Sequence, residues 1–425
     1  MKRIPFIVFI VTTLLIGMGG YGYAKAESDK KQDPLIERLI QKGVLTEEDA
    51  AEIRQQDKGF ELPKGLKGVQ VGALWYLDYS SGQEPDPGDE SSSFNEFKIT
   101  RGYLTVKKEL FPWFHTRITI DTHQDDDGDG DYENRLKYIY AELRPPDVGL
   151  FTDTKSEIGM GHIPWLDFQE HVNPYRCQGT MAIERAGVFN SADVGVSLRG
   201  YFAGELEDAE EKTGSHYYPG RYGSWHVGVY NGSGYHAREK NNNKALEGRL
   251  TLRPLPDVIP GLQLSYFGIY AEGNSDDNPA GDWPDYVVNM GYLSYENPWL
   301  ILTGHYFTTE GNAKGTWVDA RGDALETAGY SFFGNLKLPV LDRKLSLFGR
   351  YDHFDQDDDG KIGDDADYDM YIGGFVYDIY HGNLLMLCYE TTDYGDDAGK
   401  KGKIPVAGNT LGDDYKIQAV LQIKF

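Results

Sequence analysis

The sequence has few cysteines and no long apolar segment beyond its N-terminal end. Two cysteines among 425 residues exclude a disulfide-rich scaffold, and no CxxCH motif offers a haem attachment. After Met18, no stretch approaches the roughly 20 apolar residues of a transmembrane helix. HExxH, GxSxG and P-loop motifs are also absent, so no enzymatic activity is expected. The 42 Lys+Arg are outnumbered by 67 Asp+Glu, which argues against nucleic-acid binding.

The first residues have the pattern of an export signal. Lys2 and Arg3 precede an apolar run over residues 4–18, and residues 24–26 (AKA) supply the small side chains that a signal peptidase reads. We therefore expect residues 1–26 to be a cleaved signal peptide. An exported membrane protein without spanning helices must cross the bilayer as a closed β-barrel.

Residues 27–64 are expected to form a helical leader in the periplasm. The apolar side chains of residues 35–40 have helical spacing, and Gly43 is a natural C-terminal stop. Thr46 is a candidate N-cap for a second helix that reaches about Gln55. This segment either contacts peptidoglycan, a partner or the barrel mouth, or is an ordinary leader.

From Gly65 onward the apolar period changes from 3.6 to 2. In residues 415–425 (YKIQAVLQIKF), apolar side chains take the odd positions and mostly Lys or Gln the even ones. A terminal Phe on such a strand is typical of outer-membrane barrels. Similar segments, joined by alternating short and long connections, predict an all-β fold: a transmembrane antiparallel β-barrel of about 16 strands over residues 65–425. A secreted, soluble β-rich protein is the alternative that composition leaves open.

One connection, residues 164–192, is a long third external loop, and long loops are usually functional. A barrel of about 16 strands encloses a water-filled channel, which such a loop can narrow. The loop side of the predicted constriction carries Asp167, Glu170 and Glu184. Strand alternation turns three arginines into the lumen, since an arginine facing lipid costs roughly 2–4 kcal/mol at the midplane. These are Arg101, Arg117 and Arg199. They either set selectivity or pair with carboxylates for solvation.

Three segments and the C-terminal strand resemble the phosphate-selective porin O and P family. They are GVSLRGYF (195–202), SWHVGVYNGSG (224–234) and GRLTLRPLPDVIPGLQLSYFGIY (248–270). The resemblance implies a homotrimeric diffusion porin of the bacterial outer membrane. Its partners would be the lipid bilayer, lipopolysaccharide and small hydrophilic solutes. The segment between Glu205 and Gly223 departs from the family, whose corresponding periplasmic turn is short.

Two other functions fit such a barrel. It could be the sheath of a porin–cytochrome electron conduit, with haem supplied by another subunit, or a substrate-specific channel. Genomic adjacency to multihaem cytochrome genes would favour the sheath, and ligand-blockable conductance would favour the specific channel.

One acidic loop suggests calcium. Asp355, Asp357 and Asp359 precede Gly360 as in an EF-hand loop, but Ala366 stands where the bidentate Glu should be. The alternative is a set of solvated aspartates.

The two cysteines form a candidate disulfide. Cys177 lies in the long third loop, and alternation turns Cys388 into the lumen. A bond would hold the loop against the wall, but it requires Cα atoms within roughly 7 Å. Two free thiols are the alternative.

Overall fold

The computed structural model describes residues 38, 40–42, 46, 65–124, 130–276 and 282–425. It divides the chain into two compact units, Met1–Lys67 and Gly68–Phe425. In the first unit Arg38, Ile40 and Gln41 are helical, and the Lys42 N–H donates to the Arg38 carbonyl at 3.1 Å. This agrees with the helix expected before Gly43. The signal peptide over residues 1–26 and the rest of the leader lie outside the described residues, so both stay predictions.

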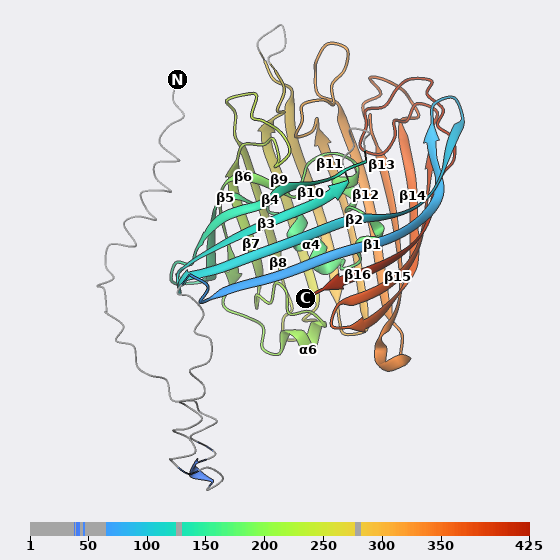
Figure 1. The fold of residues 1–425 in the computed structure, drawn as a ribbon. Coiled ribbons are helices and arrows are strands. Elements are labelled where there is room, and N and C mark those ends of the chain that lie inside the picture. The colour runs from blue at the N-terminus through green and yellow to red at the C-terminus, as the bar shows by residue number, and fades with distance from the viewer. Residues whose placement is uncertain (1–37, 39, 43–45, 47–64, 125–129, 277–281) are drawn as a thin grey trace. The chain divides into compact units, whose positions relative to one another are not determined.

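In the second unit, sixteen antiparallel strands close into a barrel in which β1 pairs with β16 (Figure 1). The expected architecture is confirmed. The strands are β1 (Val69–Asp86), β2 (Glu90–Phe111), β3 (Phe114–Gln124), β4 (Tyr132–Leu143), β5 (Phe151–His162), β6 (Ala192–Phe202), β7 (Gly223–Tyr230), β8 (Ala245–Leu252), β9 (Leu262–Glu272), β10 (Asp285–Glu296), β11 (Leu300–Glu310), β12 (Glu326–Lys337), β13 (Leu345–Asp355), β14 (Asp367–Tyr380), β15 (Asn383–Tyr394) and β16 (Asp414–Lys424).

The largest difference from the sequence-based boundaries is the first hairpin. The alternation predicts a loop over residues 80–94, whereas β1 and β2 continue to a tight turn between Asp86 and Glu90. Gly88 and Asp89 adopt positive φ angles of 85° and 61° there. The segment is rich in Ser, Gly and acidic residues, which have low strand propensity. Pairing with the neighbouring strand overrides that propensity.

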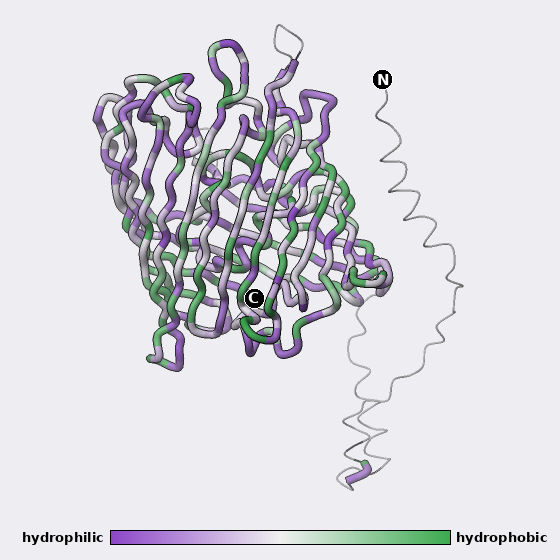
Figure 2. The backbone as a smooth tube through the Cα atoms, turned by 180° about the vertical axis from the view of Figure 1, so that it is seen from behind, coloured by the Kyte–Doolittle hydropathy of each residue, from purple (hydrophilic) through white to green (hydrophobic). Residues whose placement is uncertain are grey.

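The outer surface of the barrel is apolar along its strands. Leu104, Ile118 and Val194 fix the outward register and are 46%, 42% and 41% exposed. The connections at the upper rim are mostly hydrophilic (Figure 2). Such a surface suits lipid around the wall and water at the rim. Within the described part of the chain, no helix has the length and apolar character needed to span a membrane.

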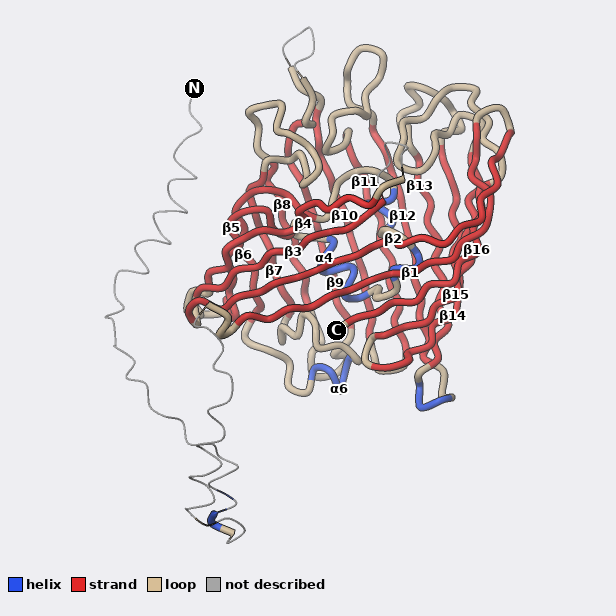
Figure 3. The backbone as a smooth tube through the Cα atoms, in the orientation of Figure 1, coloured by secondary structure: helices blue, strands red, loops and turns tan. Residues whose placement is uncertain are grey.

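The interior is not an open tube. The third loop (residues 163–191, hereafter loop 3) enters the barrel as α4 (Leu166–Val172), η1 (Arg176–Gln178) and α5 (Ala182–Arg185), as Figure 3 shows. Its buried apolar side chains pack against inward-facing side chains of β9–β15, hereafter the apolar wall. The expected water-filled lumen is therefore partly replaced by a hydrophobic core. The inward positions of β2–β8, hereafter the polar wall, are mostly polar or charged.

Among the described residues of the second unit, two further short helices lie outside loop 3. The 3-10 helix η2 (Leu341–Arg343) forms the turn between β12 and β13, and α6 (Ala209–Thr213) lies between β6 and β7. The connection that contains α6, residues 203–222, is called the strap below. It is the segment whose length departs from the resembled family.

Candidate pore constriction

Loop 3 is positioned by an aromatic cluster on the apolar wall. Trp165 has no exposed surface, and its ring lies 5.5 Å from that of Phe267 and 5.1 Å from that of Tyr292. Its indole Nε1–H donates to Gln169 Oε1 at 2.8 Å, which satisfies the buried polar atom. The burial of this aromatic side chain fixes the start of α4.

Wall arginines bind the backbone of loop 3 as well. The Arg249 Nε–H donates to the Pro164 carbonyl at 2.9 Å, and Arg350 Nη1 donates to the Thr180 carbonyl at 2.8 Å. Arg350 also pairs with Asp352 at 2.5 Å. Both arginines are buried inside the barrel. Their observed contacts are structural, because they satisfy carbonyls of loop 3 that lie outside its short helices.

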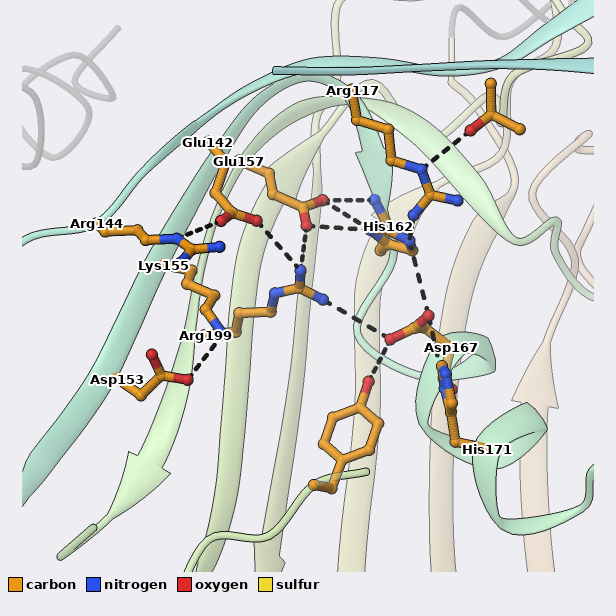
Figure 4. Close-up of polar contacts among 12 residues, drawn as sticks. Arg117, Glu142, Arg144, Asp153, Lys155, Glu157, His162, Asp167, His171 and Arg199 are labelled. Atoms are coloured by element: carbon orange, nitrogen blue, oxygen red, sulfur yellow. Dashed lines mark hydrogen bonds and ion pairs between the residues drawn. The ribbon is translucent and has the colours of Figure 1, made fainter. Parts of the chain in front are cut away.

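Figure 4 shows a network in which charged groups of the polar wall meet loop 3. Arg199 Nη2 lies 2.6 Å from Glu157 Oε1 and 3.7 Å from Glu142 Oε2. His162 Nδ1 lies 2.9 Å from Glu157 Oε2, while Arg117 Nη1 donates to His162 Nε2 at 3.3 Å. Glu157 is 2% exposed, so its charge is compensated by these neighbours rather than by water.

Asp167 connects this network to loop 3. Its carboxylate oxygens lie 3.7 Å from Arg199 Nη1, His162 Nε2 and His171 Nδ1, and it accepts a hydrogen bond from the Tyr218 hydroxyl. Burial alone would raise the pKa of Asp167, but its neighbours His171, His162 and Arg199 hold that pKa well below its usual value. Asp167 is therefore ionised in the folded barrel near neutral pH.

A second charged cluster lies further along loop 3. Arg176 Nη1 lies 2.6 Å from Glu170 Oε1, and Arg176 Nη2 lies 4.0 Å from Glu184 Oε2. Burial raises the pKa of Glu184 above its usual value, since Arg176 and the wall cations only partly offset it. Burial opposes ionisation of Glu170 too, but Arg176, Lys137 and Arg101 lower its pKa. The two glutamates therefore differ in how readily they take up a proton.

The wall that faces this cluster is cationic. The Arg101 guanidinium lies 5.6 Å from the Tyr103 ring centroid and 5.9 Å from that of Tyr76. Lys137 Nζ donates to the Tyr103 hydroxyl at 2.8 Å. Both cations act on Glu170 and Glu184 through space rather than through a direct ion pair.

The structure thus brings together part of the predicted constriction set. Asp167 and Arg199 are in contact, whereas Arg117 reaches His162 rather than a loop carboxylate. Glu170 and Glu184 pair with Arg176 of their own loop, and Arg101 faces them without touching. The role of these residues in conduction stays a prediction.

Three contributors were missed from the sequence: Lys137, Glu157 and Tyr218. Glu157 alternates in phase with Lys155 and could have been placed by that signal. Lys137 is the extra residue of a β-bulge between β3 and β4, which breaks the alternation. Tyr218 belongs to the strap, whose contact with loop 3 has no local sequence signature.

The strap lines one side of a cavity of about 580 Å³. The rings of Tyr217 and His171 lie 3.8 Å apart, and those of Tyr218 and Phe168 lie 5.0 Å apart. Polar-wall residues and the underside of loop 3 complete the lining. Its cations include Lys107, Arg117, Arg144, Lys155, Arg199 and Arg249.

The predicted calcium loop has protein partners for its carboxylates. Asp357 accepts backbone N–H groups of Lys361, Ile362 and Gly363, and Asp359 lies 2.8 Å from Lys361 Nζ. Asp355 Oδ1 accepts the Asp357 N–H at 3.0 Å. These bonds organise the loop with the chain's own groups, and calcium binding at Asp355, Asp357 and Asp359 stays a prediction.

The two cysteines are unbonded neighbours. Cys177 and Cys388 are both buried in the core, and their thiols are close enough to share a hydrogen bond. The Cys177 carbonyl accepts a hydrogen bond from the side chain of Gln418, the cross-strand neighbour of Cys388. The expected juxtaposition is present, while the disulfide itself stays a prediction.

Comparison with known proteins gives a likeness in structure alone. No protein-family model matches the chain, and no curated protein matches it in sequence. The anion-selective porin from Comamonas acidovorans superposes with a TM-score of 0.55 at 11% identity, over 84% of this chain and 99% of that one. Salmonella typhi OmpF, solved with daunomycin, gives 0.56 at 9% identity, over 84% and 97%. The outer membrane channel DcaP of Acinetobacter baumannii gives 0.50 at 11%, over 86% and 99%.

The chain has the fold of the outer-membrane porins. Its closed barrel and apolar outer surface place this porin-fold chain in the bacterial outer membrane. The narrower resemblance to the phosphate-selective family is not confirmed, because these identities establish the fold and no finer relationship.

Proposed function

We propose that this protein is a diffusion porin whose passage follows the polar wall, is constricted by loop 3 and favours small hydrophilic anions. Loop 3 packs against the apolar wall, so the route that remains for water and solutes is the side lined by β2–β8. The homotrimer, surrounded by lipid and lipopolysaccharide, is part of this proposal.

The observation that carries the anion preference is the pairing of charges across the passage. Asp167 has Arg199 as a partner, and Glu170 and Glu184 share Arg176. In contrast, four cations of β2–β4 form no ion pair with any carboxylate among the described residues: Arg101, Lys107, Arg117 and Lys137. A constriction of this kind is narrower than a few Debye lengths of about 8 Å, so unpaired wall charges act on passing ions. The anion-selective porin is a structural neighbour with the same fold.

The packed loop disfavours the sheath of an electron conduit. A cytochrome inside the barrel needs a lumen free of other protein, whereas the side chains of Trp165, Phe168 and Ile183 are buried against the wall there. A substrate-specific channel differs from the proposed porin in one measurable property, which is conductance that its solute blocks.

The test is the reversal potential of single channels in asymmetric salt. Replacing Arg101, Arg117 and Arg199 by Gln should move the reversal potential toward that of a cation-preferring pore. Because removal of Arg199 takes from Glu157 its arginine partner and leaves His162 alone beside it, a second variant, Arg101→Gln with Lys137→Gln, provides the same test without breaking a buried ion pair. Arg321→Gln, at an exposed loop arginine, is the matched control. Unchanged reversal potentials in both pore variants would contradict the proposed selectivity.

A further inference from the structure

A histidine and two aspartates meet on the outer face of the barrel, away from the lumen. His353 lies near the end of β13, and Asp367 and Asp369 lie at the start of β14. Residues 356–366 form the loop that joins these two strands. His353 Nδ1 lies 3.0 Å from Asp369 Oδ1 and 3.7 Å from Asp367 Oδ2. All three side chains are only partly exposed, between 23% and 35%. Among the described residues, this is the group whose ligand atoms have the spacing of a metal site.

The spacing suits a small transition-metal ion. Zinc bonds of about 2.0–2.1 Å to imidazole nitrogen and carboxylate oxygen place the ligands of a tetrahedral site about 3.3 Å apart. The two observed separations bracket that value. An imidazole ligand also favours zinc and its neighbours over calcium or magnesium, which prefer oxygen. We propose that His353, Asp367 and Asp369 bind one divalent transition-metal ion, with its fourth coordination position open to the outside.

Neighbouring tyrosines hold two of the ligands in place. The Tyr351 hydroxyl donates to Asp369 Oδ1 at 2.6 Å, and the Tyr330 ring stacks on the His353 imidazole with centroids 4.8 Å apart. Groups that orient ligands in this way accompany metal sites, and their loss weakens metal binding by about 10–100-fold. The site is therefore supported by residues that are not themselves ligands.

The surroundings give the ion an electrostatic role. Asp355 pairs with Asp367 across the strands, and Asp393 pairs with Asp369, so further carboxylates share the same outward face. Tyr330, the cross-strand neighbour of His353, forms a row with Tyr351 and Tyr371, with ring centroids 5.9 Å and 5.1 Å apart. Such aromatic rows mark the membrane interface of a barrel. A bound cation would offset this negative charge at the level of the lipid headgroups.

The experiment is a titration of the whole purified protein, in detergent micelles and stripped by a chelator, with Zn²⁺ followed by calorimetry. One Zn²⁺ per chain is expected at this site. His353→Ala and Asp369→Asn should remove that binding event, and Tyr351→Phe should weaken it by about 10-fold or more while leaving all ligands in place. His381→Ala, at an exposed histidine of the β14–β15 turn, should leave it unchanged.

Cobalt supplies a second measurement. Co²⁺ bound at the unaltered site should give the visible absorption of a tetrahedral centre, and His353→Ala should remove it. Electrophoretic mobility without heating reports whether each variant retains a closed barrel. Zn²⁺ affinity and stoichiometry that are the same in folded His353→Ala as in the unaltered protein would overturn the proposal, as would the absence of a binding event in the unaltered protein.

Discussion

The polar wall and the apolar wall of this barrel carry similar side chains on their outer faces and different side chains on their inner faces. Both present mainly aliphatic and aromatic side chains on their outer faces. Their inward positions differ, with Phe267, Met290 and Phe307 on the apolar wall and Arg101, Arg117 and Arg199 on the polar wall. Lipid dictates only the outward half of each strand. The inward half is free to specify either a packed surface or a passage.

Loop 3 is the element that responds to this difference. Its apolar side chains are buried against β9–β15, while Asp167, Glu170 and Glu184 belong to the charged clusters that face β2–β4 and β6. Because the loop is amphipathic, its docking needs no covalent attachment. The hydrophobic contact fixes its position, and the position brings its charges opposite the wall cations.

The largest effect is expected from removing the contact between Trp165 of loop 3 and the apolar wall. Trp165→Ala deletes a fully buried side chain, which costs about 3–5 kcal/mol in packed cores. We expect loop 3 to leave the apolar wall part of the time, giving larger and noisier single-channel currents. Trp299→Ala, at an exposed tryptophan, is the control. Identical current traces for the two variants would show that the Trp165 contact does not hold the loop.

The two cysteines allow the docking of loop 3 on the apolar wall to be strengthened. A thiol oxidant should convert the adjacent Cys177 and Cys388 into an intramolecular disulfide, since η1 packs against β15 at this point. Thiol labelling under denaturing, non-reducing conditions should then find no reactive thiol. Currents should be quieter than in the reduced protein, and Cys388→Ser should abolish both effects. Two reactive thiols per chain after oxidation would rule out the bond.

A smaller effect is expected from loosening the strap on the polar side. Tyr218→Phe removes the hydroxyl that donates to ionised Asp167, and hydrogen bonds to charged groups contribute roughly 1.5–3 kcal/mol. Residues 203–222 should exchange their amide hydrogens faster, while loop 3 stays docked on the apolar wall. Tyr380→Phe, at an exposed tyrosine of another periplasmic turn, should change neither. Equal exchange in the strap would mean that Phe168 stacking alone holds it.

The wall was accessible to prediction from the sequence because lipid imposes a strict period of two. Alternation placed all sixteen strands and turned Arg101, Arg117 and Arg199 inward. It failed at the bulge in β4, where Lys137 is the extra residue that breaks the period. The first hairpin was also misjudged, since its pairing outweighs its poor local propensity.

The arrangement inside the barrel was not accessible in the same way. The charges of loop 3 could be recognised, but their partners depend on how the loop folds back, which no period encodes. Arg176 therefore forms ion pairs with both Glu170 and Glu184, while Arg101 faces these glutamates without contacting them. The contact of Tyr218 with Asp167 joins segments 51 residues apart and follows from tertiary packing alone.

The smallest expected effect is that of protonating Glu184, which lies where loop 3 meets the polar wall. Burial raises the pKa of Glu184 and neighbouring cations lower that of Glu170, so Glu184 should take up a proton first as pH falls. A raised pKa in the folded state means that protonation stabilises the docked loop, and this contribution is lost as pH rises through that pKa. Losing one negative charge should also shift the reversal potential further toward anions.

Glu184→Gln should show the shifted potential already at neutral pH and no further step at acidic pH, whereas Glu210→Gln on exposed α6 should follow the unaltered protein. Superimposable pH profiles for Glu184→Gln and the unaltered protein would place Glu184 outside the conducting path, leaving Asp167 and the wall cations to set the selectivity.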